Sequence, residues 1–139
     1  MNRPLVITVV LLAALVLGVS FYFSDGDNRS GGTGAALVQV KVPDLTGDAK
    51  SGESLFDNKC ASCHGKNAAG QDGVAPPLVH IIYEPNHHGD ASFQRAAQNG
   101  VRAHHWRFGN MPPVEGIAAS EVEKIIAYVR TLQRANGIN

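Results

Sequence analysis

Two cysteines and a histidine lie close together at residues 60–64, in the order Cys60-Ala-Ser-Cys63-His64. The spacing Cys-x-x-Cys-His is typical of covalent attachment of a c-type haem. Two thiols about one helical turn apart can reach both vinyl groups of one porphyrin, while the adjacent imidazole is directed at the iron. The chain has only these two cysteines. The motif therefore predicts one haem c, attached through Cys60 and Cys63 and ligated by His64.

Three other uses of these side chains explain the motif less well. A structural disulfide would pair the cysteines, but it gives no reason for a histidine directly after Cys63. A thioredoxin-like redox pair belongs to a βαβ unit, whereas the residues before Cys60 have helical spacing. A zinc site needs further ligands. The five other histidines could supply them by number, but the chain has no second Cys-x-x-Cys.

The sixth coordination position of an iron held by His64 decides its chemistry. Methionine there raises the potential and favours electron transfer, whereas an open position favours gas binding or peroxide chemistry. Apart from Met1 the chain has one methionine, Met111, in a glycine- and proline-containing turn. Pro112 restricts Met111 to extended geometry, which suits a side chain held out as a ligand. We expect Met111 to be the second axial ligand; the alternative is a methionine that fills a gap in the core.

Apolar residues at helical spacing predict a helix that leads into the motif. Its apolar face is formed by Gly52, Leu55, Phe56 and Cys60. We expect Ser51 to be its N-cap and Glu53 to complement its dipole. Residues 65–77, after the motif, are rich in glycine, alanine and proline and predict a loop.

Two more helices are predicted further along the chain. Residues 91–99 form the first, with Asp90 as the expected N-cap and Gly100 as the stop. The last helix is the clearest, and Ser120 and Glu123 are expected to form its capping box. Its apolar stripe consists of Val122, Ile125, Ile126, Val129 and Leu132. Because little of the chain alternates like a sheet, we predict a small all-α fold around one haem.

Together these residues resemble a class I c-type cytochrome over about residues 48–134. The resemblance assigns the thioether bonds to Cys60 and Cys63. It makes His64 the proximal ligand and Met111 the distal ligand of the iron. It also implies that the carbonyl group of Pro76 accepts a hydrogen bond from His64.

The same resemblance extends to the packing of the first and last helices. Gly52 and Phe56 resemble the N-terminal helix of this family, and residues 125–128 resemble the facing segment of its C-terminal helix. A glycine opposite a large side chain lets two helices approach closely. The resemblance implies that this protein transfers single electrons between partner proteins, as members of this family do.

Two histidine pairs, His87-His88 and His104-His105, are less standard and resemble those of a membrane-anchored monohaem subgroup of bacterial cytochromes. Three interpretations stay open. The pairs lie in loops, exposed or bonded to backbone; or His104 or His105 replaces methionine on the iron; or the pairs form an auxiliary metal site, since imidazole suits copper and zinc.

Trp106 and Arg107 follow the second histidine pair and are candidate donors to a haem propionate. Indole N–H and guanidinium groups both donate hydrogen bonds, and a charged donor strengthens them. The alternative is an ordinary surface arginine beside a packed tryptophan.

The N-terminal part of the chain predicts a membrane anchor. Residues 5–23 carry no charge, and as a helix they would span about 28 Å, close to the ~30 Å hydrocarbon core of a bilayer. A cleavable signal peptide, with a site near residues 18–20, is the alternative. Arg3 before the span, and Asp25 and Asp27 after it, place the following domain outside the cytoplasm. We therefore predict a single-pass protein of the inner membrane with its haem domain in the periplasm.

The sequence thus divides into three predicted parts: an anchor or signal peptide at residues 1–23, a flexible linker and extended arm at 24–47, and a cytochrome c domain at 48–139. The linker is glycine-rich, and residues 37–42 alternate like a strand.

Charge and composition exclude some functions. Twelve Lys plus Arg balance twelve Asp plus Glu, so no basic field indicates nucleic acid binding. We predict an electron carrier that passes electrons between membrane or periplasmic redox partners, not a stand-alone enzyme. The alternatives are a haem-containing copper-handling or sensory module that uses the four histidines, and a subunit of an oxidase or dehydrogenase complex.

Overall fold

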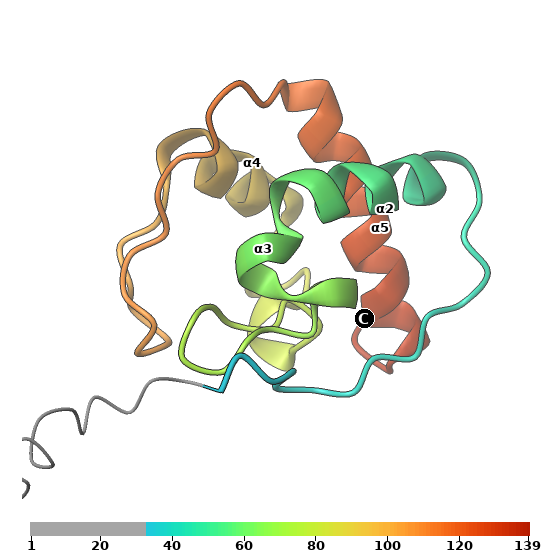
Figure 1. Cartoon of the computed structure of the whole chain (residues 1–139). Helices are drawn as coiled ribbons and strands as arrows, with labels where there is room; N and C mark the ends of the chain where they lie inside the picture. Colours follow the sequence, from blue (N-terminus) through green and yellow to red (C-terminus); the bar gives the residue numbers. More distant parts are fainter. Residues whose placement is uncertain (1–32) are drawn as a thin grey trace, which may run out of the picture. The chain divides into compact units, whose positions relative to one another are not determined.

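The computed structural model describes residues 33–139 and is mainly helical (Figure 1). Its elements are α2 (Gly47–Lys59), α3 (Ala61–His64), the 3-10 helices η1 (Lys66–Ala68) and η2 (Ile81–Tyr83), α4 (Asp90–Asn99) and α5 (Ala119–Ala135). Within residues 33–139, β structure is limited to two isolated bridges, Gln71–Ala75 and Val101–Met111. The predicted all-α class is confirmed for this part of the chain.

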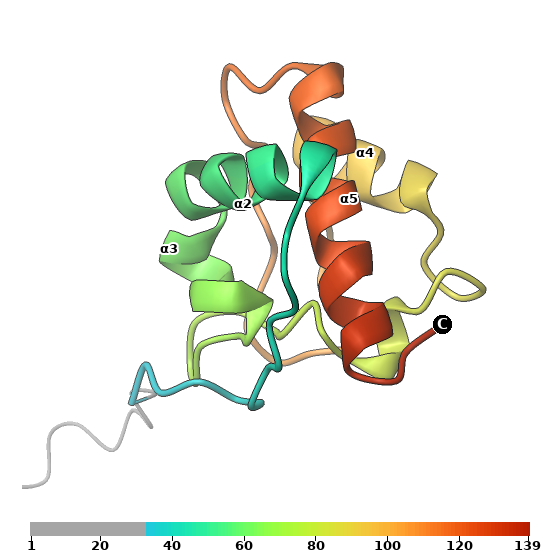
Figure 2. The same ribbon diagram turned by 90° about the vertical axis from the view of Figure 1, so that its right-hand side faces the viewer.

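The centre of the fold is the crossing of α2 and α5, which Figures 1 and 2 show from two sides. A Cβ atom at Gly52 would lie 1.9 Å from the carbonyl oxygen of Lys124, so only glycine allows this approach. One turn later the fully buried Phe56 packs on Tyr128, with ring centroids 5.5 Å apart. The predicted crossing is confirmed. The main buried cluster consists of Phe56, Ala68, Val79, Ile125, Tyr128, Val129 and Leu132.

The expected N-caps of the first two long helices are wrong. α2 begins at Gly47, so Ser51 lies inside it, where its hydroxyl donates to the Gly47 carbonyl at 3.3 Å. The apolar face that predicts this helix does not fix its start, because the first turn is mostly exposed. Asp90 is the first residue of α4 and not its cap, which is Gly89. The predicted stop of α4 at Gly100 is confirmed.

The expected capping box of α5 is also wrong. The helix begins one residue before Ser120, and its N-cap, Ala118, has no side chain that could accept a hydrogen bond. Glu121, and not Glu123, bonds back to the cap: its carboxylate accepts from the Ala118 N–H at 2.8 Å. Ser120 and Glu123 fit the box pattern by residue type, but the helix begins at Ala119, so Glu121 occupies the third helical position.

An extended arm precedes α2 and lies on the domain (Figure 2). Residues 37–42, whose side chains alternate like those of a strand, have no strand pairing within the described part of the chain. Instead, the Leu37 N–H donates to the Ala69 carbonyl at 3.1 Å. Further along, Lys41 and the Asn136 side chain exchange two hydrogen bonds of 2.9 and 2.8 Å. Within this segment Val40 packs against the main buried cluster, whereas Leu37 and Val42 remain exposed.

The predicted anchor at residues 5–23 lies outside the described residues. Among residues 33–139, no helix combines the length and hydropathy that a membrane crossing requires.

Candidate functional site

Cys63 and His64 of the Cys-x-x-Cys-His motif lie on α3, and Cys60 lies at the junction between α2 and α3. The chain enters this short helix through a bend at Cys60, whose N–H still donates to Phe56 of α2 at 2.8 Å. The two cysteines are not joined by a disulfide; Cys60 is half-buried and Cys63 is exposed. Burial, and then the neighbouring Cys63, raise the pKa of Cys60 to about 11. Before any bond is made, Cys60 is therefore held as a neutral thiol.

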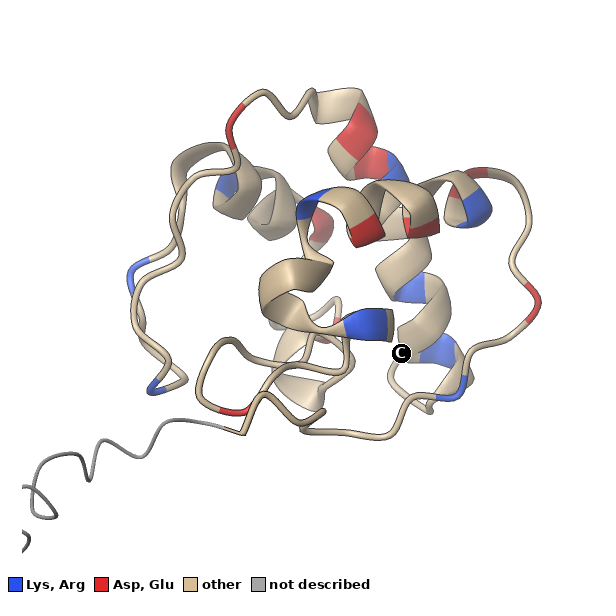
Figure 3. Cartoon of the chain, viewed as in Figure 1, with Lys and Arg blue, Asp and Glu red and all other residues tan. Residues whose placement is uncertain are grey.

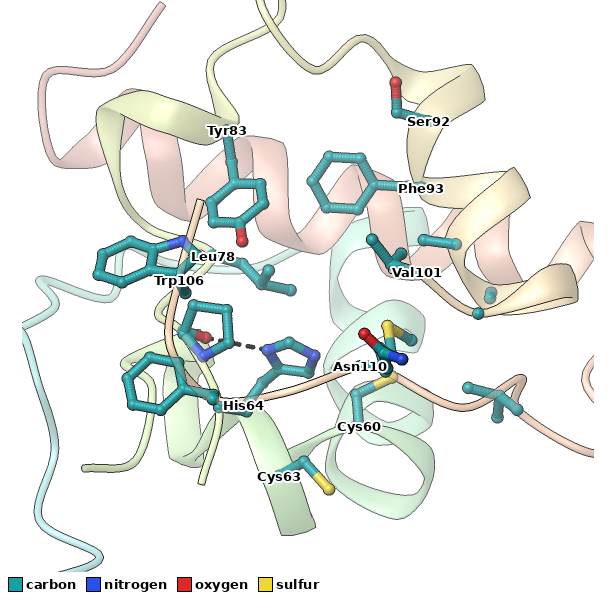
Figure 4. A pocket seen from close by; sticks show the side chains of 18 of the residues that line it. Cys60, Cys63, His64, Leu78, Tyr83, Ser92, Phe93, Val101, Trp106 and Asn110 are labelled. Atoms are coloured by element: carbon teal, nitrogen blue, oxygen red, sulfur yellow. Dashed lines mark hydrogen bonds between the residues drawn. The ribbon is translucent and has the colours of Figure 1, made fainter. Parts of the chain in front are cut away.

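His64 is oriented by the loop that follows the motif (Figure 4). Its Nδ1 lies 2.9 Å from the carbonyl oxygen of Pro76, and because a carbonyl only accepts, Nδ1 carries the proton. Nε2 is then left with its lone pair, which is the form that binds a metal. Burial lowers the pKa of His64, and the hydrogen bond to Pro76 opposes that shift.

A residue without any signal in the sequence holds this loop against α3. The side-chain amide of Gln71 donates to the carbonyl oxygens of Ala61 and Ser62, at 3.1 and 2.8 Å. The Ser62 carbonyl lies at the end of a helix, where carbonyls lack helical partners, and the Ala61 carbonyl, which already accepts from the Gly65 N–H at 3.0 Å, gains a second donor. Gln71 therefore fixes the loop that carries Pro76 relative to the helix that carries His64.

Met111 reaches the site from a different part of the chain. It exchanges two backbone hydrogen bonds with Val101, both of 2.9 Å. Gly100, beside this bridge, has φ +72°, and a Cβ atom there would lie 2.4 Å from the carbonyl oxygen of Met111. Gly100 therefore has two roles: it ends α4, and its lack of a side chain lets the backbone of Met111 lie against it. Met111 itself is half-buried.

One cavity of about 710 Å³ brings these residues together. Cys60, Cys63, His64, Pro76 and Met111 all contribute to its lining. The apolar wall includes Phe56, Val74, Leu78, Phe93, Val101, Phe108 and Ile125. The volume lies within the range of cofactor pockets, about 300–1,000 Å³, and the mainly apolar wall is typical of them.

Trp106 provides an independent test of what the cavity could hold. Its indole N–H is buried and has no hydrogen-bond partner among the described residues. Such orphaned donors are rare in folded proteins and indicate a missing acceptor. Tyr83 directs its hydroxyl toward the same space, as Figure 4 shows; burial raises the pKa of this tyrosine, and a weaker interaction with the Trp106 side chain opposes that shift. A haem fits these residues, because a propionate would supply the acceptor.

The two arginines at the cavity are not the predicted one. Arg95 and Arg102 contribute to its lining, whereas Arg107 does not and is exposed. No acidic side chain lines the cavity within residues 33–139. Figure 3 shows basic residues along the loop that carries this part of the wall, while acidic residues gather toward the start of α5.

All four histidines of the two pairs line one side of the same cavity. Nε2 of His87 lies 3.3 Å from Nε2 of His105. One ring nitrogen from each of His87, His88 and His105 lies within 4.8 Å of the others. Although His105 is exposed, partial desolvation lowers its pKa, and the imidazoles of His104, His88 and His87 lower it further.

Comparison with known proteins agrees with this arrangement. The family model for cytochrome c matches residues 49–133. Cytochrome c-554(547) of Halothiobacillus neapolitanus is 30% identical over 92 residues, which make up 63% of this chain and 99% of that relative. The matched region includes α2 to α5 almost completely, together with every side chain described above that lines the cavity.

Proposed function

The chain belongs to the cytochrome c family and binds haem c covalently, and from this premise we propose that it is a one-electron carrier with His64 and Met111 as axial ligands. The bound iron supplies a reversible one-electron couple. The observation that carries the proposal is the single cavity in which Cys60, Cys63, His64 and Met111 meet.

Each residue has a distinct proposed part in holding the haem. Cys60 and Cys63 form the thioether bonds. Pro76 accepts from Nδ1 of His64 at 2.9 Å, which keeps the lone pair of Nε2 toward the cavity. The backbone of Met111 is held by its bridge to Val101, so the residue that would be the second ligand is fixed beside the cavity.

Trp106 is the residue we propose as a propionate donor, because its buried N–H lacks a partner. Tyr83 is a second donor that the sequence did not indicate. The proposed contact of Arg107 gains no support from the cavity, since Arg95 and Arg102 line it instead. A propionate bound between buried donors stays ordered and shielded from water, which raises the strength of each hydrogen bond.

The proposed location rests on the sequence before residue 33, and the redox partners are those that the family implies. We propose that residues 5–23 anchor the protein in the inner membrane and that the linker lets the periplasmic haem domain move between donor and acceptor proteins. The cytochrome c match at residues 49–133 supports the start of the domain near residue 48. Redox partner proteins are implied by the family.

Optical spectroscopy of the haem-loaded chain tests the axial ligation. We expect the weak near-red charge-transfer band of methionine-ligated ferric haem, and no spectral change when carbon monoxide is added to the reduced protein. A missing band together with rapid carbon monoxide binding would contradict the proposal and point to a catalytic or sensory haem.

A second candidate is a haem-containing copper-handling module, or a subunit of an oxidase or dehydrogenase complex. The observation that favours copper is the convergence of ring nitrogens from His87, His88 and His105 at the cavity. In that case copper binding by these histidines, and not electron transfer by the haem alone, would be part of the function.

A further inference from the structure

We propose that His87, His88 and His105 together hold one divalent transition-metal ion, preferably Cu²⁺, at the rim of the haem cavity. This site goes beyond electron transfer by the haem, and it stands on the geometry of three imidazoles that come from two separate segments. His87 and His88 follow η2, whereas His105 precedes Trp106. The two segments meet although the paired residues are 18 positions apart in the chain.

The spacing of the nitrogens fits a metal. In tetrahedral Zn²⁺ coordination with metal–nitrogen bonds of about 2.0–2.1 Å, two ligand atoms lie about 3.3 Å apart, and in the tetragonal coordination that Cu²⁺ prefers, adjacent nitrogens lie somewhat closer. The Nε2 atoms of His87 and His105 are 3.3 Å apart. The third nitrogen, from His88, lies within 4.8 Å of both. Rotation of exposed side chains can close this remaining gap.

Hydrogen bonding prepares His88 for this role. Its Nδ1 lies 2.6 Å from the carbonyl oxygen of Ile82 and must carry the proton. The lone pair is then on Nε2, as in histidine ligands whose other nitrogen bonds to a carbonyl. Its Cα position is also fixed, because Arg130 donates to the His88 carbonyl at 2.6 Å and is only 7% exposed.

Arg130 gives the site a rigid base that an ordinary surface turn lacks. Its guanidinium also donates to the backbone carbonyl of Tyr83 at 2.6 Å and to the carboxylate of Asp90 at 2.8 Å. These bonds tie α5 to η2 and to the start of α4, on either side of the histidine turn. One half of the site is thus held by the core, and the other half, at His105, is exposed and can adjust.

The donor set selects the class of metal. Three imidazoles suit copper, zinc or nickel, and the general order of affinity places Cu²⁺ above the others. Hard cations such as Mg²⁺ prefer oxygen ligands. The exposure of His87 and His105 leaves room for water at the remaining coordination position.

His104 provides a matched control within the same cluster. Its ring lies 4.3 Å from that of His105, and its Nδ1 bonds to a backbone carbonyl as that of His88 does, but its ring nitrogens do not converge with those of the other three residues. A patch of histidines that collects metal without a defined site would use His104 as readily as His105. A defined site would not.

The experiment is a calorimetric titration of the haem-loaded full chain with Cu²⁺, Zn²⁺ and Mg²⁺, with electron paramagnetic resonance of the copper complex. We expect one Cu²⁺ per chain, nitrogen hyperfine coupling, weaker Zn²⁺ binding and no Mg²⁺ binding. His87→Asn and His105→Asn should each weaken Cu²⁺ binding about 10-fold or more, whereas His104→Asn should change it less than about 2-fold.

The haem spectrum of each variant establishes that the domain is folded and loaded. Equal losses on His104→Asn and His105→Asn would overturn the three-residue site. Retention of parental affinity in the His87→Asn/His105→Asn double variant would show that copper binds elsewhere. Either result would leave the electron-carrier proposal untouched, because the spectral test of His64 and Met111 does not involve these histidines.

Discussion

At the scale of single residues, Met111 and His64 are held by different means. A hydrogen bond to Pro76 orients His64, whereas Met111 is placed by a backbone bridge to Val101 and by the absence of a side chain at Gly100. The local motif around His64 is visible in the sequence because its parts are neighbours. The support of Met111 comes from a residue ten positions earlier, and no pattern in the sequence connects the two.

Met111→Ala should lower the reduction potential, on the order of 100 mV or more, because a thioether ligand stabilises the reduced iron. Redox titration followed by absorbance measures the change. Glu115→Gln, a neighbouring exposed substitution outside the cavity, should leave the potential unchanged. If Met111→Ala kept the parental potential, Met111 would not be a ligand of the iron.

Tyr128 makes stability depend on alkaline pH. Burial, followed by the charges of Asp57 and Glu53, raises its pKa from 10.0 to about 12. The unfolded chain therefore releases the tyrosine proton first, so its stabilising contribution is complete below pH 10 and is lost as the pH rises toward 12. The loss is on the order of 2 kcal/mol.

Denaturant unfolding at pH 9 and at pH 11 tests this dependence. Tyr128→Phe keeps the ring packed on Phe56 and removes the ionisable group, so its free energy of unfolding should fall less between the two pH values than that of the parent. Parallel losses in both proteins would assign the alkaline effect to another group.

At the scale of elements, the packing of α2 on α5 depends on one missing side chain. Gly52→Ala puts a Cβ atom 1.9 Å from a backbone oxygen of α5, and backbone cannot move aside as a flexible side chain can. We expect a loss of about 3 kcal/mol in the free energy of unfolding, measured by denaturant titration. Ser54→Ala, an exposed substitution on the same helix, should be near neutral.

The sequence predicts these elements well and their ends poorly. Helical spacing finds all three long helices, because an apolar face repeats over several turns. Ser51, Asp90 and Ser120 are plausible caps by residue type alone, yet the chain enters each helix elsewhere. The role of Arg130 is equally hard to predict. Its position near the end of α5 suggests a cation that complements the helix dipole, whereas it is a buried donor to Asp90, Tyr83 and His88.

At the scale of the whole molecule, balanced composition conceals an uneven distribution of charge. The chain has twelve basic and twelve acidic residues, but the cavity wall carries Arg95 and Arg102 and, within residues 33–139, no acidic side chain. A positive surface around an exchange site attracts negatively charged partners, and salt weakens that attraction.

Oxidation of the reduced protein by ferricyanide, an anion, should therefore slow as ionic strength increases. Arg95→Gln combined with Arg102→Gln should reduce this slope, whereas Arg134→Gln, at the end of α5 and outside the cavity lining, should preserve it. Stopped-flow absorbance gives the rates. Equal slopes in all three proteins would show that the reagent does not approach through this wall.

The extended arm also determines how the domain responds to mechanical load. Thr33 is bonded to Asp72 through its N–H and its hydroxyl, both at 3.2 Å, and the arm is bonded again at Ala69 and Asn136 before α2 begins. A pull applied on the N-terminal side of residue 33 would load these contacts one after another, like a strip peeled from a surface. The first of these contacts, at Asp72 and Ala69, belong to the loop that carries Pro76, so a pull on the arm would act on the loop that orients His64 before it reaches α2.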